Sequence, residues 1–127
     1  MRLLIDTHIF LWAFTSDAKL SEKAHLLTED VDNQLVLSIA SLWEMAVKVS
    51  IGKLEQNRTF AELVEVGVRD KGIELLQITP THLDAVATLP LHHRDPFDRL
   101  IIAQSITEAL PILTNDEKFA AYAVELL

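Results

Sequence analysis

The sequence predicts an α/β fold, a three-layer α/β/α sandwich in which helices cover both faces of a central parallel sheet. Short apolar runs typical of buried strands alternate with helical segments, and this alternation favours parallel strands joined by right-handed crossovers. The length of 127 residues suits one hydrophobic core, and only 3 glycines and 4 prolines interrupt the chain. We therefore expect residues 1–127 to form a single domain.

The first expected strand covers residues 2–5, an apolar run that ends at Asp6. Helical spacing follows this strand, and we expect the apolar residues 9–14 to form a compact turn. Serine is a residue type that begins helices, so Ser21 predicts a helix that continues to about Asp30. The residues of this helix that we expect to face the core are Ala24, Leu27 and Val31.

The middle of the chain is expected to contain one strand and two helices. Residues 35–37 form an apolar run typical of a buried strand. Ser38 and Ser41 are both suitable first residues for the next helix, which Gly52 ends. A further helix is predicted over residues 59–71, and a glycine follows it directly.

The last third of the chain repeats the alternation of strand and helix. We expect a strand over residues 73–78, a helix opened by proline over 80–88, and a loop over 89–94. A second proline opens a helix from residue 96, which ends before the strand at 111–114. The residues of this last helix that we expect to face the core are Leu100, Ile101, Ala103 and Ile106.

Composition excludes several classes of protein. The chain has no cysteine, which excludes disulfide frameworks and thiolate metal sites and fits the cytoplasm. The N-terminal apolar runs are too short to cross a membrane and do not resemble a signal peptide. A net charge of -8 argues against RNA binding by a basic surface alone. It remains compatible with a metal-dependent nuclease or with a basic protein partner.

Four carboxylates, on Asp6, Glu44, Asp98 and Asp116, each follow an apolar run where a strand ends or a helix begins. The carboxyl ends of parallel strands share one edge of the sheet, where ligands bind. Two carboxylates ~4 Å apart repel by roughly 4 kcal/mol at an effective dielectric constant of about 20. Bound Mg²⁺ or Mn²⁺ removes this repulsion, activates water and stabilises a phosphorane-like transition state, which is the chemistry of phosphodiester hydrolysis.

Each acid also has a purely structural interpretation. Ser41 and Glu44 match the capping-box pattern S-x-x-E, and Thr114 to Glu117 is a second candidate for such a box. Asp95 precedes a proline as a helix N-cap should, which places Asp98 in a first turn where negative charge is favoured. Asp6 is the hardest to explain in this way, and the placement of all four acids at corresponding junctions favours a function.

Four sequence strings together resemble the PIN domain family, and more narrowly its VapC-type ribonuclease toxins of type II toxin–antitoxin systems. The strings are Leu3-Leu-Ile-Asp-Thr-His8, Ser41-Leu-Trp-Glu-Met-Ala-Val-Lys48, His93-Arg-Asp-Pro-Phe-Asp-Arg-Leu-Ile-Ile-Ala-Gln104 and Leu113-Thr-Asn-Asp116. The resemblance implies a PIN fold and a metal-binding quartet of Asp6, Glu44, Asp98 and Asp116. It also implies Mg²⁺-dependent endonucleolytic cleavage of RNA, with Mn²⁺ able to replace Mg²⁺, inhibition by a cognate antitoxin, and a homodimer.

Several other residues are expected near this site. Asp95 is an alternative metal ligand to Asp98, although Asp98 precedes the apolar run Leu100 to Ala103 as the third acid of the family does. We expect His92 and His93 to be loop residues, and Trp12 and Trp43 to pack in the core or in an interface. Lys48 is expected to pair with Glu44 one turn earlier. The candidates for supporting the acids or contacting substrate are Thr7, Asp95, Thr114, Arg94 and Arg99.

Two other functions compete with the nuclease. The first is a non-catalytic module whose acidic edge binds a basic protein, with the acids acting as helix caps. The second is a phosphatase of the haloacid dehalogenase type, which also begins with a strand ending in aspartate. That class needs a second aspartate two residues later, where this chain has His8, so the sequence disfavours it.

Overall fold

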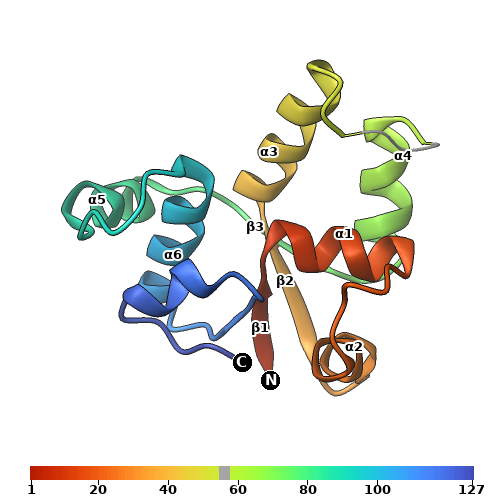
Figure 1. Cartoon of the computed structure of the whole chain (residues 1–127), viewed down its shortest axis with the longest axis horizontal. Coiled ribbons are helices and arrows are strands. Elements are labelled where there is room, and N and C mark those ends of the chain that lie inside the picture. Colours follow the sequence, from red (N-terminus) through yellow and green to blue (C-terminus); the bar gives the residue numbers. More distant parts are fainter. Residues whose placement is uncertain (55–57) are drawn as a thin grey trace.

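The computed structural model describes residues 1–54 and 58–127 and confirms the predicted α/β/α sandwich. In this part of the chain, one parallel sheet has the strand order β3-β2-β1-β4 (Figure 1). The order reverses at β1, because β2 and β3 lie on one side of it and β4 lies on the other. The strands are β1 (Arg2–Ile5), β2 (Gln34–Ser38), β3 (Glu74–Leu76) and β4 (Ile112–Leu113).

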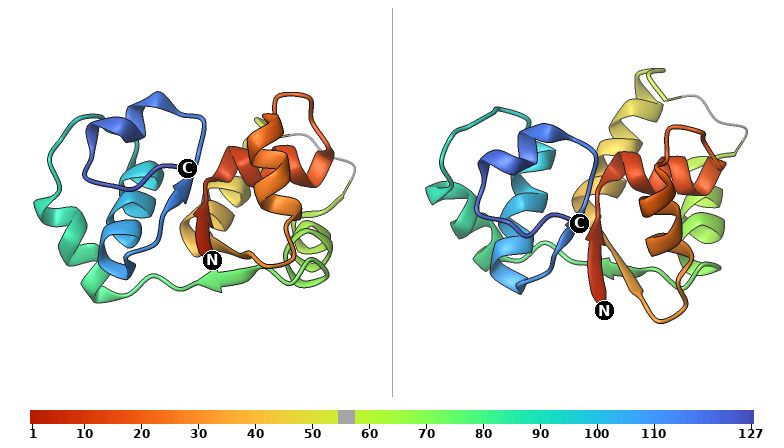
Figure 2. Two further views of the ribbon diagram at one scale, coloured as in Figure 1. Left: turned by 90° about the horizontal axis from the view of Figure 1, so that it is seen from below. Right: turned by 60° about the horizontal axis from the view of Figure 1, so that its bottom comes forward.

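Helices occupy both faces of the sheet, as Figure 2 shows from two further directions. The α-helices are α1 (Thr7–Thr15), α2 (Glu22–Glu29), α3 (Ile39–Ser50), α4 (Phe60–Val64), α5 (Pro80–Thr88) and α6 (Pro96–Glu108). A π-helical turn η1 (Glu65–Arg69) extends α4, and a 3₁₀-helix η2 (Glu117–Ala121) follows β4. None of the helices in the described ranges is both long and apolar enough to cross a membrane.

Alternation along β1 divides the core between the two faces. Leu3 and Ile5 pack into a cluster with residues of α1, α2, α3, α4 and η1, whereas Leu4 packs with residues of α6 and η2. All three side chains are buried, so β1 is covered on both faces as a central parallel strand should be. The layer arrangement therefore follows directly from the apolar run at the N-terminus.

The first correction concerns residues 9–14, which belong to helix α1 and not to a compact turn. The carboxylate of Asp6 accepts a hydrogen bond from the backbone N–H of Ile9 at 2.8 Å and thereby caps the helix. The segment has no polar face, since Ile9 and Phe10 are buried and the following apolar residues are half-buried. The helical spacing in the sequence is therefore confirmed, but without a polar face the pattern did not indicate a helix of 9 residues.

The remaining corrections concern element ends and two side chains. The helix predicted over 59–71 changes to π geometry after Val64, and the strands predicted over 73–78 and 111–114 are shorter. Val31 is 95% exposed because α2 ends at Glu29 and the chain then turns away. Ile106 is 43% exposed on α6, where Ile102 is buried instead.

Candidate metal centre

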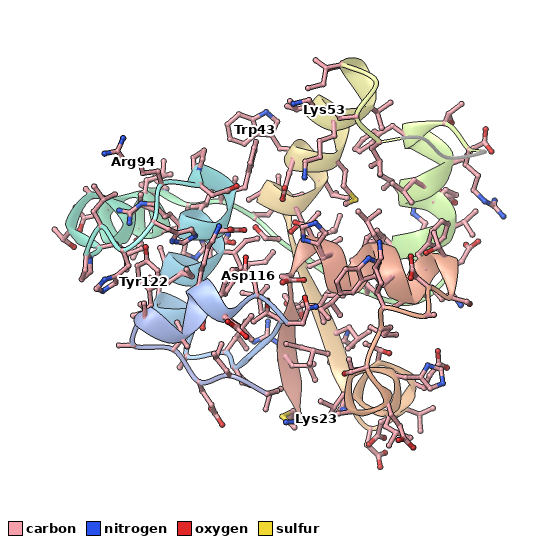
Figure 3. All side chains as sticks on the ribbon, viewed as in Figure 1. Lys23, Trp43, Lys53, Arg94, Asp116 and Tyr122 are labelled. Atoms are coloured by element: carbon pink, nitrogen blue, oxygen red, sulfur yellow. The ribbon has the colours of Figure 1, made fainter. Side chains whose placement is uncertain are left out.

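Three of the four predicted acids lie where the chain leaves the carboxyl end of a strand, and the fourth, Asp98, lies at the start of the helix that leads into β4. Asp6 follows β1 directly, and Asp116 lies three residues after β4, the neighbour of β1. Glu44 lies in α3, which begins where β2 ends, and Asp98 lies in the first turn of α6. The reversal of strand order at β1 places the pair Asp6 and Asp116 at the point where ligands bind in open parallel sheets. Figure 3 labels Asp116 at this edge.

Asp6 is buried and has a hydrogen bond to each of its carboxylate oxygens. Oδ1 accepts from the Ile9 N–H, and Oδ2 accepts from the hydroxyl of Thr114. The Thr114 oxygen in turn accepts from the backbone N–H of Asp116 at 3.0 Å, so one threonine connects the two acids. Burial raises the pKa of Asp6; the two hydrogen bonds lower it, and the negative charge of Asp116 raises it further.

Glu44 is buried inside α3 and does not form a capping box. The N-cap of α3 is Ser38, whose hydroxyl accepts from the Ala40 N–H at 3.0 Å, so the predicted box at Ser41 is wrong. The Glu44 carboxylate accepts from the hydroxyl of Thr7 at 2.8 Å and from Nζ of Lys48 at 2.8 Å. The predicted ion pair with Lys48 is confirmed, and it lowers the cost of burying this charge.

Asp98 and Asp95 have different roles at the start of α6. Asp95 is the N-cap, as predicted, because its Oδ1 accepts from the Asp98 N–H at 2.9 Å. The Asp98 carboxylate caps nothing and lies 3.3 Å from Nε2 of His93. Burial raises the pKa of Asp98 to about 6, and the charges of Asp95, Glu44 and Asp116 add to the increase.

These pKa shifts place the four acids in one electrostatic environment. Asp116 raises the pKa of both Asp6 and Asp98, and Glu44 raises that of Asp98. In the described ranges, however, no three His, Asp or Glu side chains lie close enough together to hold a metal ion. The donor set consists of carboxylate and hydroxyl oxygens, which is the chemistry that Mg²⁺ and Mn²⁺ require. The residues present therefore fit a hard divalent cation by the chemistry of their donor atoms.

The second predicted capping box is also wrong. The N-cap of η2 is Asp116, which accepts from the Lys118 N–H at 2.9 Å, whereas the Thr114 hydroxyl binds Asp6. Asp6, Asp95 and Asp116 are thus helix caps, but Glu44 and Asp98 are not. The interpretation as helix caps therefore accounts for Asp6 and Asp116 but not for Glu44 and Asp98.

The predicted supporting residues divide into two groups. Thr7 and Thr114 contact the acids Glu44 and Asp6 directly. Arg99 instead donates to the carbonyl oxygens of Leu89 and Pro90, so it anchors the loop before α6 and does not pair with Asp95. Arg94 is exposed at the surface, as Figure 3 shows.

The two tryptophans also differ from each other. Trp12 is half-buried against the core, as predicted. Trp43 is 54% exposed, and its ring lies edge-on to Phe97 with 4.8 Å between ring centroids. Core packing is therefore the wrong interpretation for Trp43, whereas a role in an interface stays a prediction.

Three residues near the acids were missed by sequence reasoning: Ser41, His93 and Tyr122. The Ser41 hydroxyl lies 2.9 Å from that of Thr7, and His93 joins Asp98 to Tyr122. His93 lies five residues before Asp98, which is the one sequence signal that pointed to it. Of the four acids, only Asp116 is near Tyr122 along the chain. The contact of Tyr122 with His93 therefore depends on the fold.

Solved structures of toxin–antitoxin complexes contain chains with a similar fold. VapBC2 from Rickettsia felis, bound to a DNA fragment from their promoter, matches with a TM-score of 0.73 and 18% identity, over 100% of this chain and 98% of that one. A toxin–antitoxin complex from Klebsiella pneumoniae matches with a TM-score of 0.68 and 16% identity, over 98% and 95% of the two chains. VapBC-5 from Mycobacterium tuberculosis, a member of the VapBC family of toxin–antitoxin systems, matches with a TM-score of 0.63 and 23% identity, over 99% and 97%.

The family assignment comes from the sequence itself. No curated protein matches the chain. The sequence pattern of the PIN domain matches residues 3–125, a range that includes all four acids and every strand of the sheet except the first residue of β1. The predicted family is confirmed: this chain belongs to the PIN domain family.

Proposed function

We propose that this protein is a metal-dependent endoribonuclease that acts as the toxin of a toxin–antitoxin pair. The observation that carries the proposal is the placement of Asp6, Glu44, Asp98 and Asp116 at one edge of the sheet, where their charges act on one another. Glu44 and Asp98 are buried or half-buried without a capping role, so a function is the better account of them. Membership of the PIN domain family supports the same reaction class.

The four acids would hold Mg²⁺, with Mn²⁺ able to replace it. When bound, the cation supplies Lewis-acid stabilisation of the phosphoryl oxygens and lowers the pKa of water. The chain contributes the orientation of the carboxylates, through the hydroxyls of Thr7 and Thr114. Lys48 partly neutralises Glu44, which reduces the negative charge that an RNA phosphate would meet.

The competing function is an acidic module that binds a protein and cleaves nothing. The caps formed by Asp6, Asp95 and Asp116 favour this alternative, because each of them has a structural reason to be present. Glu44 and Asp98 count against it, because neither carboxylate caps a helix and burial of the Asp98 carboxylate is costly. Metal binding and RNA cleavage separate the two functions.

The test of the nuclease is cleavage of a complex RNA pool, because a narrow target would be missed with one chosen RNA. We expect new internal ends at a few sequences when the protein is incubated with total RNA and Mg²⁺, and none when EDTA replaces the metal. Sequencing of the new ends measures this directly. Cleavage that persists in EDTA would show that the acids do not act through a cation.

A cavity of about 400 Å³ beside α1 is a candidate binding site for a protein partner. It lies between α1, α2 and η1, and its apolar part includes Phe10, Phe14 and Ile73. Its charged lining consists of Glu29, Asp30 and Lys71, so acidic residues outnumber basic ones, which together with the net charge of -8 favours a basic segment. We propose that an apolar side chain from a basic segment of the antitoxin occupies this cavity.

Filling the cavity is expected to weaken antitoxin binding without affecting the acids. Ala13 lines the cavity on α1, so Ala13→Leu should reduce affinity for the antitoxin about 10-fold, or about 1.4 kcal/mol. The matched control is Ala87→Leu, an exposed position of α5 on the other face of the sheet. Calorimetric titration of both variants measures the difference. Equal affinities would place the antitoxin elsewhere.

The homodimer and the cytoplasmic location implied earlier stay predictions. For the homodimer, α3 and its C-cap residue Ile51 present an apolar stripe at intervals of four residues, formed by the exposed side chains of Trp43, Val47 and Ile51. The stripe supports a self-association surface, because exposed apolar residues in register on one helix are typical of interfaces.

A further inference from the structure

The hydroxyl of Tyr122 is a centre of hydrogen bonding next to the candidate metal centre. It accepts from the backbone N–H groups of His92 and His93 and from Nη1 of Arg99, each at 3.2 Å. It also lies 2.8 Å from Nδ1 of His93. Tyr122 is buried, and its ring stacks edge-on with both histidine rings. Four contacts at one phenol oxygen fix its geometry tightly.

The crowding at this oxygen determines which atom donates to His93. A phenol has one proton to donate and two lone pairs with which to accept. Three N–H groups already share those lone pairs, so the contact with His93 is the one in which Tyr122 donates. Nδ1 of His93 is therefore an acceptor, and the ring carries its proton on Nε2.

The fixed tautomer directs a donor at the third acid of the cluster. Nε2 of His93 lies 3.3 Å from Oδ2 of Asp98, and with the proton on Nε2 it donates to that carboxylate. The His93 side chain is only 11% exposed, so it has little freedom to turn away. Arg99 holds the same loop by donating to the carbonyl oxygens of Leu89 at 3.1 Å and Pro90 at 2.9 Å.

We propose that His93 is a positioning residue for Asp98 and that Tyr122 sets its tautomer. One oxygen of the Asp98 carboxylate is held by the Nε2–H of His93, and the other is left for the divalent cation. The inference rests on the proposed metal-dependent function. It assigns to the C-terminal segment, through Tyr122, a part in building the site.

The alternative is that His93 only packs, since its ring also lies 6.4 Å from that of Phe119. Two substitutions separate packing from hydrogen bonding. His93→Leu keeps an apolar side chain of similar size and removes the donor, whereas His93→Gln restores an N–H donor near the position of Nε2. His25→Leu is the control, because His25 is exposed on α2 and packs in the part of the fold that does not include Tyr122 or Asp98.

The first measurement is Mn²⁺ affinity, determined by calorimetric titration. We expect His93→Leu to bind Mn²⁺ about 10- to 100-fold more weakly than wild type, and His93→Gln to recover most of the loss. His25→Leu should bind Mn²⁺ as wild type does. Equal affinity of wild type and a folded His93→Leu variant would overturn the proposal, and so would a His93→Gln variant as weak as His93→Leu.

The second measurement needs no metal and distinguishes this proposal from the proposed function. Nitrogen chemical shifts of the histidine rings, recorded at about pH 8 where histidine is neutral, report the tautomer. We expect the Nε2–H tautomer for His93 in wild type and its loss in Tyr122→Phe. A wild-type His93 protonated on Nδ1 would overturn the proposal. Absence of any Mn²⁺ binding by wild type, with the Nε2–H tautomer present, would instead overturn the metal-dependent function.

Discussion

Replacing Asp98 by asparagine is expected to reduce RNA cleavage about 1,000-fold, equivalent to about 4 kcal/mol of transition-state stabilisation. Asparagine keeps the size of the side chain and an oxygen that His93 can contact, but it removes the negative charge that a cation requires. The fold should be unaffected, because the cap of α6 is Asp95 and the Asp98 side chain caps nothing. Single-turnover cleavage of an identified RNA target, with circular dichroism to confirm the fold, measures both effects.

Asp95→Asn is the matched control for this experiment. It removes one negative charge three residues away and keeps the helix cap, since asparagine caps as well as aspartate does. We expect its cleavage rate to stay within a few-fold of wild type. A folded, active Asp98→Asn protein would refute the assignment of Asp98. An inactive Asp95→Asn protein would transfer the role to Asp95.

The sequence predicted the sheet and the edge at which the acids lie, because both follow from local patterns. Alternation of strand and helix gave the parallel sheet, and the burial of Leu3, Leu4 and Ile5 on two faces confirms it. Helix α1 was expected only as a compact turn, because its residues are apolar on nearly every side and no amphipathic pattern marks its full length. The helix begins after Asp6 because the Asp6 carboxylate caps it, and the position of Asp6 depends on β1.

The capping motifs show why the chemistry at the edge could not be predicted in full. Ser41 and Glu44 have the right spacing for a capping box, but the helix had already begun at Ser38. Ser41 is thereby buried beside Thr7 from another element, and Thr7 binds Glu44. Contacts of this kind join residues more than 30 positions apart, and no local pattern encodes them.

Asp6 shows that a cap and a candidate ligand are compatible roles for one side chain. Its Oδ1 caps α1 and its Oδ2 accepts from Thr114, so the helix end fixes the orientation of the carboxylate. A structural role and a functional role therefore do not exclude each other for an acid of this site, although the sequence analysis treated them as alternatives. The capping contact is part of what holds the acid at the edge of the sheet.

Addition of Mn²⁺ is expected to raise the melting temperature of wild type by roughly 10 °C. A ligand present at about 100 times its dissociation constant adds about 2.7 kcal/mol to the free energy of unfolding, and a domain of this size converts that into such a shift. Calorimetry with and without Mn²⁺ measures it. Asp98→Asn should show almost no shift, because one ligand of the site has lost its charge.

Without metal, Asp98→Asn is expected to be at least as stable as wild type at pH 7. Burial raises the pKa of Asp98 to about 6 in the folded chain, so between its ordinary pKa and about pH 6 the folded state binds more protons than the unfolded state. Lowering the pH through this window therefore stabilises wild type, and the asparagine variant lacks this contribution.

The pattern of melting temperatures decides between the two functions. If Mn²⁺ stabilises wild type and not Asp98→Asn, the acids form one metal site, because a charge on α6 then controls binding at an edge shared with β1 and β4. Equal shifts for both proteins would mean that Mn²⁺ binds elsewhere on a chain of net charge -8. If Mn²⁺ changes the melting temperature of neither protein, the acids do not form a metal site. The acidic binding module then becomes the better account of this PIN domain.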